Sequence, residues 1–524
     1  MVICVNVRAD ADSISNTPPL FELSLNDYRN LVLQRNETLQ AQMLETEVSR
    51  HKAKGTYGAF EPLFEASVTR EINQRTNNVQ QQASQLGQPT FSERNNIYDS
   101  GIESLLPSGA KIRLGYTLSD LDNNVSGNPY TPIATNFTRQ FQTFVGVTFD
   151  QPLLKDGGFS TTLAELRLAA MDSEIAFQEY RRQLMLTVSR AESAYWNLYF
   201  AQEQLHFFDE SVAVAQSVLA DSRQKWQAGQ GAELDMMEAQ SDLALRETKR
   251  NDALQSYFDA VGAMQAMAGG SLIPRINGLE EPQLHVTDVP VSTNAPVSYF
   301  DVAQDSTELN PDYLIGEQKL RQEEVRLGVA KNQVLPQLDL KAAYGYNGLG
   351  NTPGDSWSVA ASQDYPSWSV GLELIIPMAG NIKNRNLLHA NQLSLQEAYL
   401  NLKGEQEDIA SRLNTAIHKS AAWEQSIQSC QTVVHYNEEL LQTEQQRLKA
   451  GRVDGHRVLE VEADLLDSRQ ELANSLVQYR CSLLELELVS GSLLKNRNLD
   501  ITKNELKQQT ASFMDAAHKS AENF

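Results

Sequence analysis

Four segments of the chain alternate apolar and polar residues with a period of two. They cover residues 64–69, 141–149, 337–346 and 367–376. This alternation predicts half-buried β-strands, each with one apolar and one polar face. The sequence contains no run of about 18 apolar residues, so it predicts no membrane-spanning helix. Two-faced strands in such a chain are typical of a β-barrel wall between lipid and water.

Two long segments instead repeat apolar residues at every seventh position. The first has no proline or glycine between Ser160 and Gln227, and the second keeps the same spacing from Leu395 to Cys430. A strict seven-residue period predicts a left-handed coiled-coil seam. At ~1.5 Å per residue, the first helix would be roughly 100 Å long. An ordinary cytosolic coiled coil has the same heptads, but the paired strands that precede both long helices disfavour it. The seam positions of the first helix are Leu163, Ala170, Phe177, Leu184, Ala191, Leu198, Leu205, Val212, Leu219 and Trp226.

The chain also contains an internal repeat. Each copy is predicted to hold a helix, two strands, a very long helix, a turn and a shorter return helix. The fold class is therefore mainly α with a small β part, built from long antiparallel helical hairpins. The pairs that define the repeat are Pro62 with Pro336, Gly158 with Gly380, Gly229 with Gly451, and Tyr257 with Tyr479.

The repeat sets the predicted domain boundaries. We divide the chain into an N-terminal segment (1–23), repeat 1 (24–270), a linker (271–298), repeat 2 (299–494) and a polar C-terminal tail (495–524). The tail is expected either to be disordered or to pack against the middle of the helices. Repeat 1 carries a polar insertion at 76–136, in which residues 111–118 alternate as an extra strand. We expect that strand to extend a hairpin at the outer surface, which leaves four barrel strands per chain.

Composition and charge exclude several functions. Hydrophobic residues make up 41% of the chain, which is normal for long solvated helices, and the net charge of −23 argues against nucleic acid as a partner. The sequence has no G-x-x-x-x-G-K-[ST] phosphate loop and no H-E-x-x-H metal helix. The eight histidines are scattered. We expect no enzymatic activity, no cofactor and no bound metal.

The amino terminus and the cysteines bear on the compartment. Residues 1–5 are too short to be a secretory signal, so we expect either a removed leader or a start codon assigned too late. Lipidation of Cys4 is disfavoured because Ile3, which precedes it, is not a small residue. Cys430 and Cys481 would be offset along an antiparallel hairpin by roughly 13 Å. That offset is too great for a disulfide.

Several phrases together resemble one known family. Residues 149–158 (FDQPLLKDGG), 334–340 (VLPQLDL) and 368–372 (WSVGL) are similar to the strand signatures of TolC-like outer membrane efflux proteins. The turns at 225–229 and 447–451 resemble the helix-hairpin tips of that family. The ordered set covers about residues 25–494, and its presence in both halves is specific.

The resemblance implies a homotrimer in the cell outer membrane. Each subunit would give four strands to one twelve-stranded barrel, and the helices would form a tunnel across the periplasm. Four strands cannot close a barrel alone, and lipid does not tolerate open sheet edges. The implied function is a passive exit duct, served by an inner-membrane pump of the RND, MFS or ABC type through a periplasmic adaptor. The outer membrane component of type I protein secretion shares this fold, and a soluble coiled-coil scaffold is the more distant alternative.

The resemblance also places functional residues at the hairpin tips. Family members close the tunnel there with polar links and a ring of acids, which threefold symmetry multiplies. Arg457 stands where an acid of that ring is usual, so it is expected to pair with Asp235 or Asp454 instead. Ordinary solvated charges near a helix end would look the same in sequence. The predicted gate comprises Asp235, Arg452, Asp454, Arg457 and Glu460.

A second role at the tips is docking of the adaptor protein. The small and apolar residues around both turns are expected to line grooves between neighbouring hairpins. The other interpretation is that these residues only permit a tight turn, and the two are compatible. The predicted docking residues are Trp226, Ala228, Gly229, Leu448, Ala450 and Gly451.

Overall fold

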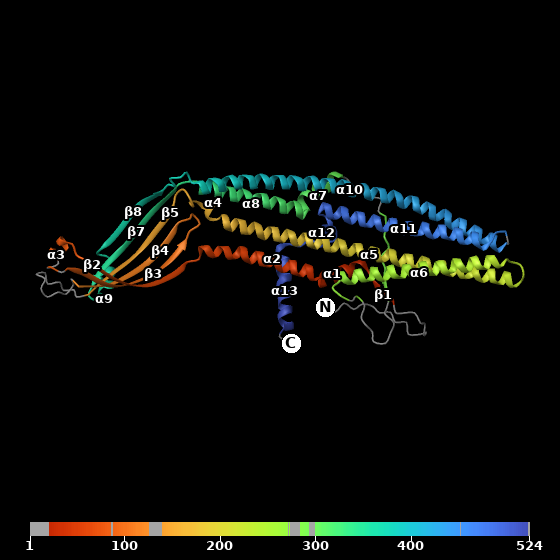
Figure 1. The fold of residues 1–524 in the computed structure, drawn as a ribbon, viewed down its shortest axis with the longest axis horizontal. Helices are drawn as coiled ribbons and strands as arrows, with labels where there is room; N and C mark the ends of the chain where they lie inside the picture. The colour runs from red at the N-terminus through yellow and green to blue at the C-terminus, as the bar shows by residue number, and fades with distance from the viewer. Residues whose placement is uncertain are drawn as a thin grey trace. The chain divides into compact units, whose positions relative to one another are not determined.

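The computed structural model describes most of the chain (Figure 1). The described residues are 20–84, 87, 89–124, 139–270, 272, 283–292, 299–450 and 452–521. Cys4, Gly451, and most of the predicted N-terminal segment and linker lie outside them. The chain separates into two compact units. Unit 1 draws on Met1–Glu47, Ile175–Glu317 and Leu402–Phe524, and unit 2 on Val48–Glu174 and Gln318–Asn401.

Long helices dominate the described chain, as the heptads predict. The two longest are α5 (Ala164–Gln227) and α10 (Ile382–Lys449), and they return as α6 (Glu233–Met267) and α11 (Gly455–Ser490). Both breaks fall at the predicted turns. The heptad seam of α5 is buried at Phe177, Leu184, Ala191 and Leu198. The other helices near these are α1 (Leu25–Arg35), α2 (Glu37–Gly55), α7 (Tyr299–Leu309) and α8 (Pro311–Gln333).

A two-stranded sheet crosses the middle of unit 1. Strand β1 (Leu20–Leu23) pairs in parallel with β6 (Gln283–Val286). Buried tyrosines tie this sheet to the long helices. The Tyr195 hydroxyl donates to the Leu23 carbonyl at 3.0 Å, and the Tyr257 hydroxyl donates to the Leu284 carbonyl at 2.8 Å. Burial raises the pKa of Tyr195 to about 12, so it remains a hydrogen-bond donor at physiological pH.

The C-terminal tail packs against the middle of unit 1. After α12 (Leu493–Asn496), the Arg497 guanidinium binds both carboxylate oxygens of the buried Glu192, at 2.9 and 3.0 Å. Helix α13 (Lys503–Ala521) then inserts Leu506, which is 1% exposed, into the main core. Of the two arrangements predicted for the tail, its described part adopts the packed one.

The large sheet of unit 2 is antiparallel throughout, in the order β2-β3-β4-β5-β7-β8. Its strands are β2 (Leu63–Thr76), β3 (Thr90–Leu105), β4 (Lys111–Asn123), β5 (Gln140–Pro152), β7 (Gln337–Gly350) and β8 (Pro366–Ile375). The sheet therefore holds two strands more than the four predicted for the barrel wall. The strand predicted at 111–118 does not extend a hairpin at the surface. It is β4, which pairs with β3 on one side and with β5 on the other.

Short helices border this sheet. They are η1 (Thr56–Phe60), α3 (Val79–Ser84), α4 (Phe159–Thr162) and α9 (Pro353–Ala361). Helix α9 packs on β5 and β7, where the Ser356 and Thr143 hydroxyls are 2.8 Å apart and both side chains are buried. Among the described residues, no helix is both long and apolar enough to cross a membrane. Nor do they contain a cluster of His, Cys, Asp and Glu side chains suited to a metal ion.

Candidate functional site

The turn between α5 and α6 forms the first predicted tip. Gly229 adopts φ +77°, a left-handed conformation that favours glycine after a helix end. The Gln230 amide donates to the Lys225 carbonyl at 2.9 Å, which satisfies one of the last carbonyls of α5. Trp226 is 42% exposed, and Ala228 and Gly229 are also exposed. The three predicted docking residues of this turn therefore lie at the surface.

The turn between α10 and α11 has the same backbone bond. The Arg452 amide donates to the Arg447 carbonyl at 2.9 Å. In the internal repeat these two residues correspond to Gln230 and Lys225 of the first turn, at the same 222-residue offset. Asp454 is the N-cap of α11, and its carboxylate accepts the Arg457 amide at 3.0 Å. Leu448 is half-buried and Ala450 is exposed. Gly451, the sixth docking candidate, lies outside the described residues.

A small cavity, here called the acidic hollow, lies between the α5–α6 turn and the start of α11. It has a volume of about 110 Å³. Its lining brings together the predicted gate residues Asp235 and Asp454, with Glu238, Asp242 and His456 beside them. The His456 Nδ1 atom lies 3.9 Å from the nearest Asp242 carboxylate oxygen. The hollow therefore gathers carboxylates from α6 and from the N-cap of α11 beside Lys225 and His456.

The predicted pairing of Arg457 is wrong. Its guanidinium binds Glu460 at 2.5 Å, one turn along the same helix, rather than Asp235 or the Asp454 carboxylate. Spacing along α11 explains this, since residues three apart face each other on a helix. The hydrogen bond and the charge of Glu460 raise the pKa of Arg457 further. Both side chains are about half exposed, and Arg452 is exposed too.

A buried ion pair, about two turns into α11 and nearly four turns into α6, was not predicted from the sequence. Arg246 of α6 binds the Glu462 carboxylate of α11 and the Ser211 hydroxyl of α5. Its second terminal nitrogen donates to the Leu459 carbonyl at 3.0 Å. Only 9% of the Arg246 side chain and 8% of the Glu462 side chain are exposed.

A sequence signal for this pair exists. Positions 239, 246, 253 and 260 are spaced by seven residues, and all are alanine except Arg246. Glu462 lies on a face of its helix that leucines and valines otherwise form. A charge at a seam position requires a partner, because an unpaired buried charge costs several kcal/mol. The partner itself is 216 residues away in sequence. Arg469 of α11 adds a second link, since it binds both Glu210 of α5 and Glu438 of α10.

The large sheet presents a second candidate surface. One face carries an exposed apolar row across all six strands, α9 covers the part of that face near Thr143, Gly348 and Gly350, and the opposite face is mainly polar. The strand register places six apolar side chains in one row, each directly opposite the next, with exposures between 42% and 73%. Soluble proteins rarely leave so continuous an apolar patch in water. The row consists of Phe64, Ile102, Leu114, Val147, Tyr344 and Trp368.

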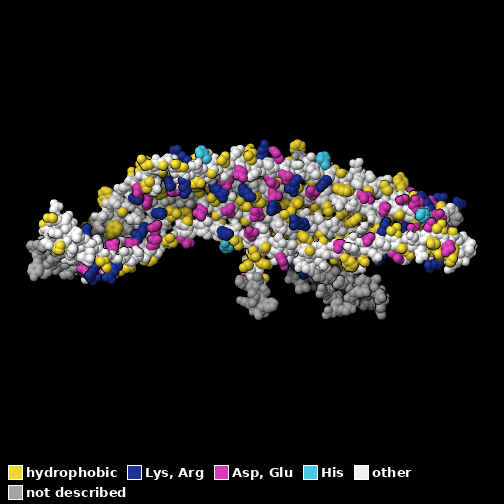
Figure 2. All heavy atoms as spheres, viewed as in Figure 1, with side chains coloured by type: hydrophobic (Ala, Val, Ile, Leu, Met, Phe, Trp, Pro, Cys, Tyr) yellow, Lys and Arg dark blue, Asp and Glu magenta, His cyan; other side chains and the backbone are white. Residues whose placement is uncertain are grey.

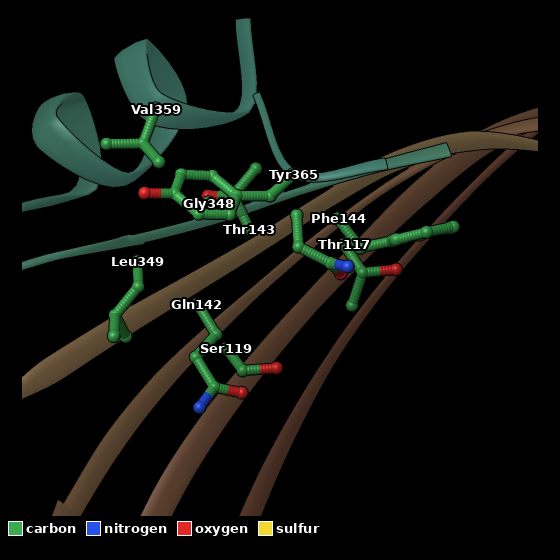
Figure 3. A pocket seen from close by; sticks show the side chains of 10 residues that line it. Thr117, Ser119, Gln142, Thr143, Phe144, Gly348, Leu349, Val359 and Tyr365 are labelled. Atoms are coloured by element: carbon green, nitrogen blue, oxygen red, sulfur yellow. The ribbon is translucent and has the colours of Figure 1, made fainter. Parts of the chain in front are cut away.

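A cavity of about 690 Å³ lies beside α9 (Figure 3). Its lining comes from β4, β5, β7, α9 and the segment after α9, and includes Thr117, Gln142, Phe144, Val359 and Tyr365. No acidic, basic or histidine side chain contributes to it. Acidic and basic side chains are instead interspersed over the helices on the face shown in Figure 2.

Comparison with known proteins identifies the family. The model of the outer membrane efflux protein family matches residues 111–270 and 302–492. The chain belongs to this family. The match covers more than half of the sequence and both long hairpins, which confirms the resemblance that the strand and turn phrases predict.

Other family members extend the comparison. The outer membrane protein TolC of Vibrio cholerae is 23% identical over 378 residues, which cover 68% of this chain and 78% of TolC. The proteases secretion protein PrtF of Dickeya chrysanthemi is 22% identical, with coverages of 68% and 74%. The crystal structure of the Campylobacter jejuni CmeC outer membrane channel superimposes with a TM-score of 0.60 at 15% identity, over 90% of this chain and 88% of CmeC. The mainly helical fold with a smaller strand part is therefore the fold of these channels.

Proposed function

We propose that three copies of this chain form an outer membrane channel that serves as the exit duct of an efflux system. The observation that carries the proposal is the exposed apolar face of the six-stranded sheet. Lipid acyl chains would cover that face, and the polar face would line a water-filled lumen. The soluble scaffold alternative would leave the same apolar row in water, which is unfavourable by about 25 cal/mol for each Å² of apolar surface.

The open edges of the sheet support assembly. Strands β2 and β8 each pair on one side only within the sheet. Unpaired strand edges are not tolerated in lipid, so each must pair with another copy of the chain. A closed barrel from three sheets meets this requirement. The long helices of each subunit would then form the tunnel in the periplasm.

The tips are proposed as the closed entrance and the adaptor site. Asp235 and Asp454 share the acidic hollow, and Arg452, Arg457 and Glu460 lie on the exposed surface nearby. Three copies would bring these charges into a ring around the entrance. The turns around Trp226, Ala228, Gly229, Leu448, Ala450 and Gly451 would contact a periplasmic adaptor that carries substrates from an inner-membrane pump. Transport through the duct needs no cofactor and no bond-making chemistry.

The similarity to PrtF favours a second candidate cargo. PrtF is a proteases secretion protein, so the same duct could pass unfolded proteins in a type I secretion system. TolC and PrtF match this chain at nearly the same identity, 23% and 22%. The shape of the duct is common to both functions.

Deletion of the gene tests the function and separates the two cargoes. Loss of an efflux duct should raise the accumulation of a fluorescent cationic dye several-fold and leave the secreted proteins of the culture unchanged. Loss of a secretion duct should remove one protein from the supernatant and leave dye accumulation unchanged. Unchanged results in both assays, together with recovery of the protein in the soluble fraction, would overturn the proposal.

A further inference from the structure

The hairpin formed by β3 and β4 has the same two faces as the rest of the sheet. Ile102 and Leu114 belong to the apolar row and are 48% and 56% exposed. On the opposite face, Arg113 binds the Asp99 carboxylate, and the Thr117 hydroxyl donates to Asp99 at 2.7 Å. A loop projecting into water would not need apolar side chains in register with this row. The hairpin is therefore built like a strand pair between lipid and a polar lumen.

A row of glycines crosses four strands on the polar face. Gly101, Gly115, Gly146 and Gly345 lie directly opposite one another in the register. Large neighbours occupy the space that side chains would need. A Cβ atom on Gly115 would lie 3.1 Å from the Arg113 guanidinium, and one on Gly345 would lie 2.6 Å from the ring of Phe144.

The glycine row indicates which face is concave. Bending a sheet crowds the side chains of its inner face, and glycine at that point relieves the crowding. The row lies on the polar face and includes both β3 and β4. This arrangement allows β3 and β4 to curve together with β5 and β7, with the polar face of the sheet on the inside.

The turn of the hairpin is fixed at the helix end of the sheet. The Ser108 carbonyl accepts the Gly158 amide at 3.0 Å and the Gln151 side-chain amide at 3.1 Å. Gly109 has φ +90°, and a Cβ atom there would lie 2.9 Å from the Asp156 carbonyl oxygen. The turn is therefore held against the junction between β5 and α4. Both strands of the hairpin extend from that junction along their neighbours.

From these observations we propose that β3 and β4 form part of the membrane wall, so that three copies close an eighteen-stranded barrel. This inference rests on the proposed function above. The partner of each open edge is a second copy of this chain. Strand β2 leads away from the helix end and β8 returns to it, so β8 of one copy meets β2 of the next in the antiparallel sense that the rest of the sheet uses.

The consequence is a wider outlet than twelve strands would give. Barrel diameter grows about linearly with strand number, so eighteen strands give about 1.5 times the diameter of twelve. With strands ~4.8 Å apart and tilted by ~40°, the backbone cylinder is ~36 Å across rather than ~24 Å. Barrels of 16–18 strands leave an aqueous channel. Arg113 and Asp99 would line this lumen.

Site-directed fluorescence tests the position of the hairpin. The three native cysteines are replaced by serine, and an environment-sensitive dye is attached to Leu114→Cys or Thr117→Cys in the trimer in liposomes. The dye at position 114 should be quenched several-fold more by spin-labelled lipid than by aqueous iodide, and the dye at 117 should show the reverse. A matched pair on β8, Leu372→Cys and Ser369→Cys, has the same two faces and reports on the barrel itself.

The labelled pairs on β4 and β8 distinguish failure of this inference from failure of the proposed function. Quenching of both β4 positions by iodide, with normal alternation on β8, would place the hairpin outside the wall and overturn the inference while leaving the duct intact. Loss of alternation on β8 as well would overturn the proposed function. If a cysteine variant does not assemble, electron cryo-microscopy of the unmodified trimer counts the strands directly. Eighteen strands support the inference, and twelve refute it.

Discussion

Removing the Glu462 carboxylate should loosen the hairpin tips far more than removing an exposed carboxylate two residues away. Glu462→Ala leaves the Arg246 guanidinium in a site that is 9% exposed, with only the Ser211 hydroxyl and the Leu459 carbonyl as polar partners. Breaking a buried pair by removing one partner costs about 3–5 kcal/mol. Because 1.4 kcal/mol corresponds to a factor of ten, local opening should become roughly 10²- to 4 × 10³-fold more frequent.

Glu460→Ala is the matched control. Glu460 lies on the same helix and also binds an arginine, but the side chains of this pair are 54% and 45% exposed. An exposed ion pair of this kind contributes about 0–1 kcal/mol. Replacing both members of the buried pair, as Arg246→Met with Glu462→Leu, removes the uncompensated charge and should recover most of the lost stability.

Native-state hydrogen exchange of the amides in α6 and α11 measures these differences locally. The exchange of tip amides should accelerate strongly in Glu462→Ala and barely change in Glu460→Ala. Equal effects in the two single variants would show that burial does not govern the strength of this pair. A double variant as unstable as Glu462→Ala would show that the uncompensated charge is not the cause.

Three further predictions concern the stability of unit 1. Gly491→Ala should destabilise the folded state by about 1–3 kcal/mol, because φ is +78° and the new Cβ atom would lie 2.5 Å from the Asn310 amide nitrogen. Gly262→Ala should instead stabilise it by about 0.5–1 kcal/mol, because no atom lies near the new methyl group on α6. Thermal unfolding in detergent measures both changes. Desolvation raises the pKa of Glu203, so the folded state binds this proton more tightly than the unfolded chain does. The stability of the fold therefore falls as pH rises above 4.5, the ordinary pKa of a glutamate. Glu203→Gln should therefore unfold at a higher temperature than the wild type at pH 7 and at the same temperature at pH 3.5; a gap of the same size at both pH values would contradict this. Glu192→Ala should loosen the C-terminal tail, because Arg497 loses both Glu192 oxygens and keeps only Glu487, at 3.0 Å, as an ion-pair partner; trypsin should then cleave near Lys503 faster.

The sequence predicted those features that local periodicity encodes. Apolar residues occupy nine successive heptad positions in α5 and six in α10, and the turns that follow contain glycine, so helix type and helix ends were predictable. The strand at 111–118 was recognised from its alternation. Its place in the sheet was not, since pairing with β5 depends on contacts that no local pattern specifies.

Strand β3 and the ion pairs show the same limit. The outward position between Tyr98 and Ile102 of β3 holds the polar Ser100, and the inward position before Tyr98 holds the apolar Ile97, so no clear alternation marks the strand. Arg457 with Glu460 is a local pair at helical spacing and was predictable from the sequence. Arg246 with Glu462 joins two hairpins, and only the presence of a charge at each seam position hinted at it.

Conductance across a planar lipid bilayer tests whether this chain forms a channel. In the proposed channel, the apolar sheet face of three copies lies in lipid around a water-filled lumen. Protein extracted from the outer membrane with detergent should therefore run as a trimer and produce discrete ion-conducting steps when added to the bilayer. A monomer that stays in solution without detergent, and leaves the bilayer electrically silent, would contradict it.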